Sequence, residues 1–119
     1  MNCLDTYALV EIQEGNPAFV DLFHGSFVVT DITLAEFYGV LYRRMGQQTA
    51  DYWRRKIEPF VVDVSRDMLI VATKYRIDNN KEDLSFVDCV GYMYSIENGI
   101  PFVTGDKAFK NKKGVRFIK

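Results

Sequence analysis

Four acidic residues are placed where they could meet at one edge of a folded sheet. Asp5 follows a short apolar stretch, and Asp106 follows the stretch IPFVT by one glycine. Glu36 and Asp88 lie near the beginning of two segments whose apolar residues recur at helical spacing. Carboxylates that lie close together repel one another, and a hard divalent cation with oxygen ligands relieves that repulsion. The four acids therefore predict a Mg²⁺ or Mn²⁺ site if the fold gathers them.

Such a site suits the hydrolysis of a phosphodiester. An ion held by carboxylates polarises the phosphoryl group, activates a water molecule and stabilises the leaving oxygen. The other candidate ligands do not favour a softer metal, because Cys3 and Cys89 belong to no CxxC pair and His24 is the one histidine. We expect two reduced, mostly buried thiols and a histidine at the surface with no catalytic role.

Each acid also has an ordinary structural explanation. The four-residue stretches that begin at Thr33 and Ser85 fit the capping box, in which a hydroxyl and a carboxylate bind free backbone N–H groups. Asp5 and Asp106 fit helix N-caps. Taken singly, each acid is explained as a cap, so the prediction of a metal site depends on the four lying around one cleft.

The elements that would position these acids alternate along the chain. Short apolar runs predict strands at 2–4, 26–30, 60–62, 101–104 and 115–118. Helical spacing predicts helices at 6–13, 34–45, 48–57, 66–76 and 87–98. This alternation predicts an α/β fold, a mostly parallel sheet covered by helices on both faces, in a single domain over residues 1–119. Ligands of such sheets bind beyond the carboxyl ends of the strands, which is where the acids fall.

Composition narrows the class of protein further. The chain has 119 residues, with 15 Lys and Arg against 16 Asp and Glu, so it is not a generally basic nucleic-acid binder. Its 48% hydrophobic content excludes intrinsic disorder. The longest aliphatic run, 68–72, is far below the ~20 residues that cross a bilayer, and residues 1–5 lack the features of a signal peptide. We therefore expect a cytoplasmic protein with no membrane partner.

Four short motifs in order carry a resemblance to a known family. They are Leu4-Asp5-Thr6, Thr33-Leu-Ala-Glu36-Phe37, Ser85-Phe-Val-Asp88 and the stretch GIPFVTGDKAF over 99–109. In this order and spacing the chain resembles a PIN domain, and within that family the small toxin endoribonucleases of VapBC toxin–antitoxin pairs. The resemblance spans nearly the whole chain.

The resemblance implies a five-stranded parallel sheet and an acidic pocket that binds Mg²⁺ or Mn²⁺. It also implies an RNA substrate, a homodimer and a cognate antitoxin. Asp5, Glu36, Asp88 and Asp106 fall on the family's catalytic acidic quartet. The three aspartates are assigned to the metal, and Glu36, also near the metal, is assigned to the attacking water. Three hydroxyl residues are predicted to hold these acids in place: Thr6, Ser85 and Thr104. One departure is Gly91, where such proteins often have alanine.

The C-terminal stretch is the candidate RNA contact. From Asp106 to Lys119 it carries five lysines and Arg116 against one acid. A basic tail that begins beside the acidic site would neutralise RNA phosphates. The lysines predicted to bind RNA are Lys107, Lys110, Lys112 and Lys113. Trp53 is predicted to belong to an exposed patch on which an antitoxin docks.

Other enzyme and nucleotide-binding classes fit the sequence less well. Asp5 is followed by Thr6-Tyr7, not by the Asp-x-Asp of haloacid-dehalogenase-like phosphatases, and the paired acids of a receiver domain are missing. Neither GxGxxG nor GxxxxGK[ST] occurs, which excludes common nucleotide-binding motifs. A housekeeping RNA-processing nuclease and a non-catalytic PIN-like scaffold that binds RNA or protein both remain as alternatives to the toxin.

Overall fold

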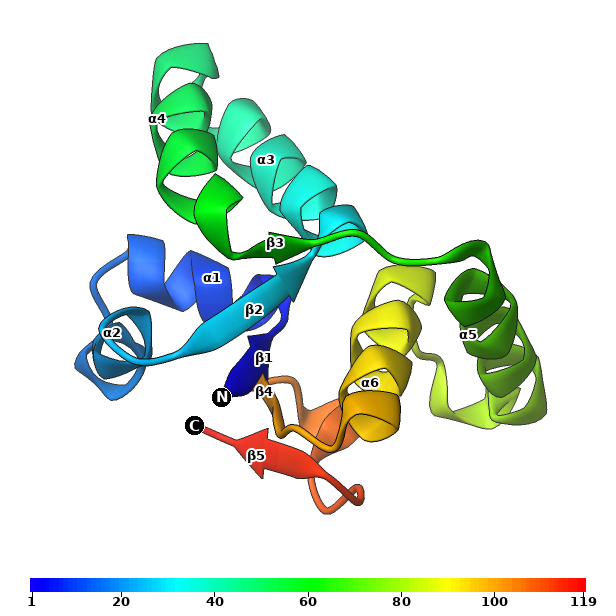
Figure 1. Ribbon diagram of the computed structural model, residues 1–119. Coiled ribbons are helices and arrows are strands. Elements are labelled where there is room, and N and C mark those ends of the chain that lie inside the picture. Colours follow the sequence, from blue (N-terminus) through cyan, green and yellow to red (C-terminus); the bar gives the residue numbers. More distant parts are fainter.

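The core of the molecule is one five-stranded sheet, seen here in a computed structural model that describes residues 1–119 (Figure 1). The strands are β1 (Asn2–Leu4), β2 (Phe27–Thr30), β3 (Val61–Val62), β4 (Phe102–Thr104) and β5 (Val115–Phe117). They lie in the order β3-β2-β1-β4-β5, and every neighbouring pair is parallel. The predicted α/β fold with a parallel five-stranded sheet is confirmed, and each strand lies within one residue of its predicted bounds.

Six α-helices connect these strands. They are α1 (Thr6–Gln13), α2 (Pro17–Phe23), α3 (Asp31–Met45), α4 (Gln47–Ile57), α5 (Arg66–Asp78) and α6 (Phe86–Asn98). Three 3₁₀ turns add Glu58–Phe60, Asn80–Glu82 and Lys107–Phe109. Helix α2 was not predicted, although Asn16 caps it by accepting from the Ala18 amide and Pro17 opens it. Both are helix-start signals, but seven residues are too few to show a helical period.

The two faces of the sheet are covered by different helices. On one face Leu4, Val29 and Val103 are buried in a cluster with apolar residues of α1 to α4. On the other face Cys3 and Phe102 are buried with residues of α5 and α6. Figure 1 shows α1 and α2 on one side of the strands and α5 and α6 on the other. Successive side chains of a strand point to opposite faces of the sheet, so the sheet contributes apolar residues to both clusters, as expected for a sheet that is buried on both faces.

Gly91 is explained by the close packing of α6 on this sheet. A Cβ atom at residue 91 would lie 2.8 Å from Cε1 of Phe102, whose side chain is fully buried. Glycine inside a helix costs about 1 kcal/mol relative to alanine. Here an alanine would force the Phe102 ring to move within a packed core. The departure from the family pattern therefore serves the packing of α6 against β4.

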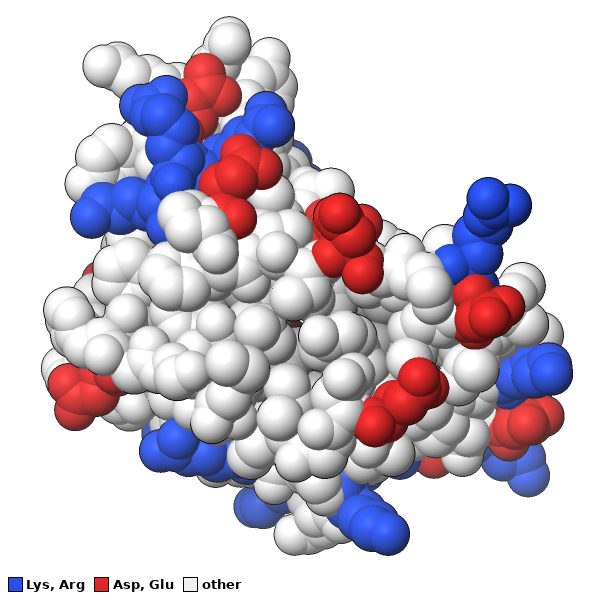
Figure 2. Space-filling model, viewed as in Figure 1, with Lys and Arg blue, Asp and Glu red and all other residues white.

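Helices α3 and α4 form an antiparallel hairpin that extends beyond the β3 edge of the sheet (Figure 1). Lys and Arg side chains gather over this hairpin on the face shown in Figure 2. Trp53 does not form the exposed patch that was predicted for it. Its ring packs against Phe23 and Phe37, because the apolar face of α4 is turned toward the cluster that contains Leu4, Val29 and Val103.

No helix of the molecule has the length and apolar character needed to cross a membrane.

The topology places a crevice at the carboxyl end of β1. The chain leaves β1 toward β2 and β3, and later returns to β4 on the opposite side of β1. The carboxyl edge at such a reversal is the usual ligand site of an open α/β sheet. Asp5 follows β1 directly, and α3 follows β2. Gly105 alone separates Asp106 from β4, so three of the predicted acids belong to segments that leave the sheet at this edge.

Candidate active site

The four predicted acids line one cavity of about 410 Å³. They come from four different elements: Asp5 directly precedes α1, Glu36 lies in the second turn of α3, Asp88 lies in the first turn of α6, and Asp106 precedes a 3₁₀ turn. The cavity is also lined by Thr6, Tyr7, Val10, Glu11, Glu14, Val40 and Arg44. The structure therefore brings the whole quartet to one place, as the sequence prediction required.

Asp5 is the most buried of the four, with 2% of its surface exposed. Its Oδ1 accepts a 2.8 Å hydrogen bond from the Ala8 amide, which makes it the N-cap of α1. The pKa of Asp5 is raised to about 8, mainly by burial and in part by the negative charges of Asp88 and Asp106. The Thr104 hydroxyl and the Ala8 amide oppose that rise in pKa without cancelling it. Asp5 is thus both the predicted cap and a strained carboxylate.

Asp88 has the same electrostatic character in a less buried position. Its backbone amide donates to the Ser85 hydroxyl oxygen at 3.1 Å, so Ser85 caps α6 as predicted. Burial raises the pKa of the Asp88 carboxyl to about 6, and the charges of Glu36 and Asp106 act in the same direction. The Asp88 carboxylate therefore lies among other acids at the N-terminal end of α6.

The capping box predicted at Thr33 and Glu36 is wrong. Helix α3 begins at Asp31, and its cap is Thr30, whose hydroxyl oxygen accepts from the Thr33 amide at 3.1 Å. Thr33 is buried in the first turn, so Glu36 lies in the second turn, out of reach of a capping role. Its Oε1 accepts instead from the Thr6 hydroxyl of α1. Because Glu36 does not cap its helix, its carboxylate can line the cavity.

Asp106 is held in place by its own turn. Its amide donates to the Thr104 hydroxyl oxygen at 3.0 Å, and its Oδ1 accepts from the Ala108 amide at 3.0 Å. Thr104 is fully buried and interacts with both Asp5 and Asp106. Each of the three predicted hydroxyl residues therefore contacts at least one acid of the quartet.

The donor set fits a hard divalent cation. The ion pairs of the chain are Arg54–Glu58 and Lys112–Glu82, so no side-chain cation is paired with any of the four acids. A carboxylate as buried as Asp5 needs a positive partner to stay ionised at neutral pH. Oxygen-only donors around such a carboxylate are the ligands that Mg²⁺ and Mn²⁺ prefer. As the side chains stand, no three of them have the spacing of a formed metal site.

Comparison with protein families decides the classification. The sequence model of the PIN domain matches residues 3–115. The chain belongs to the PIN domain family. No curated protein matches its sequence.

Solved structures of similar shape share the fold of this PIN domain at low sequence identity. VapC20 of Mycobacterium tuberculosis, a toxin that cleaves the sarcin–ricin loop, is 19% identical with a TM-score of 0.85 over 100% of both chains. A toxin–antitoxin complex from Klebsiella pneumoniae is 15% identical with a TM-score of 0.75, covering 98% of this chain and 96% of that one. The DNA-bound VapBC of Salmonella typhimurium is 16% identical with a TM-score of 0.73, covering 98% and 95%.

The predicted RNA-binding lysines of this PIN domain do not lie together. Lys107 follows Asp106 and is exposed. The ammonium of Lys110, also exposed, lies 5.8 Å from the ring centroid of Phe117, which pairs with the last residue of β4 at the carboxyl edge. Lys113 precedes β5 and lines a separate cavity with Ile100 and Pro101, next to the amino end of β4.

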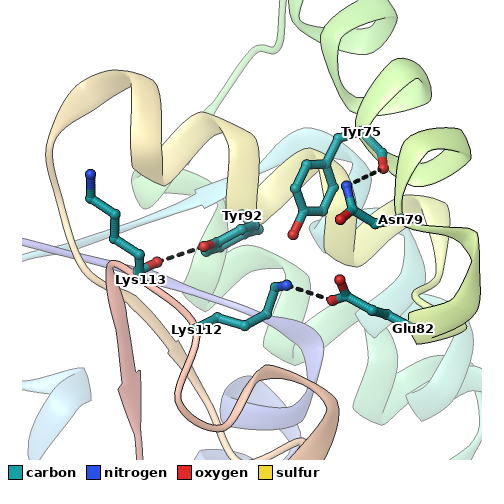
Figure 3. Close-up of polar contacts among 6 residues, drawn as sticks. All are labelled: Tyr75, Asn79, Glu82, Tyr92, Lys112 and Lys113. Atoms are coloured by element: carbon teal, nitrogen blue, oxygen red, sulfur yellow. Dashed lines mark hydrogen bonds and ion pairs between the residues drawn. The ribbon is translucent and has the colours of Figure 1, made fainter.

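Lys112 is occupied by partners within the chain. Its ammonium pairs with Glu82, and the same group lies 5.5 Å from the ring centroid of Tyr75 and 5.8 Å from that of Tyr92 (Figure 3). The Tyr92 hydroxyl donates to the Lys113 carbonyl at 2.6 Å. These contacts join the C-terminal stretch to α5 and α6. Of the four predicted lysines, only Lys107 and Lys110 therefore remain as candidate phosphate contacts at the carboxyl edge of the sheet.

Sequence reasoning missed the residues that extend the cavity along two helices. Tyr7, Val10 and Glu11 lie on one face of α1, and Glu14 continues that face at the C-cap. Val40 and Arg44 lie on the α3 face that carries Glu36. The signal was available, because residues at i, i+3, i+4 and i+7 share a helix face with the residue next to a predicted ligand.

Proposed function

We propose that this PIN domain is a metal-dependent endoribonuclease and the toxin of a toxin–antitoxin pair. The observation that carries the proposal is the meeting of Asp5, Glu36, Asp88 and Asp106 in one cavity without a paired side-chain cation. Burial and mutual repulsion raise the pKa of two of these carboxyls, which a bound divalent cation would reverse. The family as a whole supports nuclease chemistry at such a quartet.

Asp5, Asp88 and Asp106 would hold Mg²⁺ or Mn²⁺, directly or through water. When bound, the ion polarises the phosphoryl group and lowers the pKa of a water molecule. Glu36 would orient that water and accept its proton. Because Thr6 already donates to Oε1 of Glu36, the other carboxylate oxygen, Oε2, is the one available for the proton. Thr104 would keep Asp5 and Asp106 in register.

The toxin assignment is supported by the names of the structural neighbours. One is a toxin that cleaves an RNA loop, and two are toxin–antitoxin assemblies. We extend to this chain an RNA substrate, a cognate antitoxin and a homodimeric state. We place the activity in the cytoplasm, where Cys3 and Cys89, both free and buried, stay reduced.

Induced expression in a bacterial host tests this proposal. We expect the wild-type chain to arrest growth and to produce new RNA 5′ ends, mapped by sequencing total RNA before and after induction. The Asp106→Asn variant keeps the Oδ1 acceptor of its turn, so it should accumulate to the same level without either effect. New RNA ends without growth arrest would indicate a housekeeping nuclease. Equal arrest by both proteins would contradict the nuclease itself.

A further inference from the structure

An exposed aromatic ring lies at the acidic cavity. Tyr7 lines the cavity with the quartet, and 37% of its surface is exposed. Two other tyrosines are highly exposed, Tyr42 at 55% and Tyr52 at 48%, but neither lines this cavity. A large aromatic side chain at a surface loses the benefit of burial. Its position beside the four acids therefore calls for a functional explanation.

The Tyr7 ring is fixed against the backbone next to Asp106. A Cβ atom on Gly105 would lie 2.1 Å from Cε1 and 2.6 Å from Cζ of Tyr7, so the ring occupies the space that any other residue would fill. The φ angle of Gly105 is not in the positive region, so close approach and not backbone strain requires the glycine. The ring also packs on Phe19, with 5.9 Å between the two ring centroids. Tyr7 is thus a preorganised surface.

In the folded chain, Tyr7 is a close neighbour of two acids of the quartet, Asp5 and Asp106. It follows Asp5 by two residues, and its ring rests on the residue that precedes Asp106. A phosphate that reaches the quartet brings the neighbouring nucleotides to the same place. In single-stranded RNA the bases are unstacked and bind to aromatic side chains, each worth about 1–3 kcal/mol. An aromatic ring can therefore hold RNA at a site whose own charge repels phosphate.

We propose that Tyr7 binds RNA by stacking on the base of a nucleotide next to the cleaved phosphate. This inference rests on the proposed ribonuclease function and adds to it a position that reads unpaired RNA. Because stacking needs no counterion release, it adds affinity that does not depend on salt, unlike a lysine contact. The site would thereby favour loops and single strands over paired RNA.

The test uses the RNA that the wild-type protein cuts, shortened to a single-stranded oligonucleotide around the cut. An abasic nucleotide is placed at each position in turn, and KM and kcat are measured for wild type, Tyr7→Phe and Tyr7→Leu. We expect Tyr7→Leu to raise KM by about 5- to 150-fold and Tyr7→Phe to change it by less than about 2-fold. An abasic nucleotide at one position next to the cut should raise the KM of the wild type and should not raise the KM of Tyr7→Leu any further.

Tyr52→Leu is the matched control, because it removes another exposed tyrosine outside the cavity. Its KM should be that of the wild type. A second measurement does not depend on the leucine variant folding: photo-crosslinking of 5-iodouridine RNA to the Asp106→Asn protein should attach the nucleotide beside the cut to Tyr7. The stacking role alone would be overturned if the wild type cut the RNA and Tyr7→Leu were as sensitive as the wild type to the abasic position. Crosslinks at residues other than Tyr7 would overturn it as well. A wild-type protein that neither binds nor cuts RNA would overturn the nuclease as well.

Discussion

Replacing Asp5 with Asn is expected to abolish RNA cleavage and, in metal-free buffer, to raise the free energy of unfolding. The variant keeps the Oδ1 acceptor for the Ala8 amide, so the N-cap of α1 survives. It removes a buried carboxyl group whose ionised form is disfavoured by burial and by the charges of Asp88 and Asp106. We expect a gain of at least about 1 kcal/mol at neutral pH, the equivalent of about one pKa unit. Loss of a metal ligand should reduce cleavage by about 10³-fold.

The stability effect has a definite pH dependence. Burial raises the pKa of Asp5 to about 8 in the folded chain, whereas in the unfolded chain it is near its ordinary value of about 4. The folded state therefore binds more protons between these two pH values, and the free energy of unfolding falls as the pH rises through this range. Asp88, with its pKa raised to about 6, contributes in the same direction. Asp5→Asn should thus equal the wild type near pH 4 and exceed it increasingly up to pH 8.

Urea unfolding of both proteins in EDTA across this pH range measures the effect. Asp63→Asn is the control, because Asp63 is exposed and lies outside the cavity. It should show no pH-dependent gain over the wild type. A lower stability of Asp5→Asn at pH 8 would mean that the Asp5 charge is neutralised within the chain, and would contradict the strained-carboxylate account.

Reversing Lys107 and Lys110 together to Glu is expected to weaken RNA binding strongly. Both are exposed, Lys107 follows Asp106, and Lys110 lies beside Phe117 at the carboxyl edge of the sheet. Each lysine that contacts a phosphate releases counterions when RNA binds. For single strands, losing two such contacts reduces the slope of log K against log salt by about 1.4. We expect affinity near 0.1 M salt to fall by about 10-fold or more.

The matched control reverses Lys74 and Lys113, which changes the net charge by the same amount away from the cavity. Lys74 is an exposed residue of α5, and Lys113 lies near the amino end of β4. Filter binding or fluorescence anisotropy against salt compares the two double variants in the Asp106→Asn background. Equal salt slopes for both would show that the effect is one of overall charge, and would remove Lys107 and Lys110 from the RNA contact.

The fold could be predicted in detail because local and tertiary signals agree. In Leu4-Asp5-Thr6 the last strand residue, the helix cap and the first helical residue are consecutive, and the structure has all three where the pattern placed them. The error at Thr33 had a specific cause. Thr30 and Thr33 are both hydroxyl residues that can cap a helix, and Thr30 is the cap because α3 follows β2 with no connecting loop.

The candidate site was predictable where it depended on topology, and less so where it depended on side-chain direction. The position of the acidic quartet follows from the order of strands and helices, because the residues that come directly after parallel strands all lie at the carboxyl edge of the sheet. The lysines do not follow the same rule, because residues 107–114 run from the carboxyl end of β4 to the amino end of β5. Neighbours in sequence, such as Lys110 and Lys113, are thereby sent to opposite ends of the sheet. The partner of Lys112, Glu82, lies 30 residues away and has no sequence signal.

The central claim is that the acidic quartet holds a divalent cation that cuts RNA. The most direct measurement is cleavage of structured RNA by the purified chain with Mn²⁺ or Mg²⁺, beside EDTA, Asp5→Asn and Asp63→Asn. We predict cutting by the wild type and Asp63→Asn that requires the ion, is absent in EDTA and is lost in Asp5→Asn. Cutting that persists in EDTA, or that Asp5→Asn performs at the wild-type rate, would contradict the account.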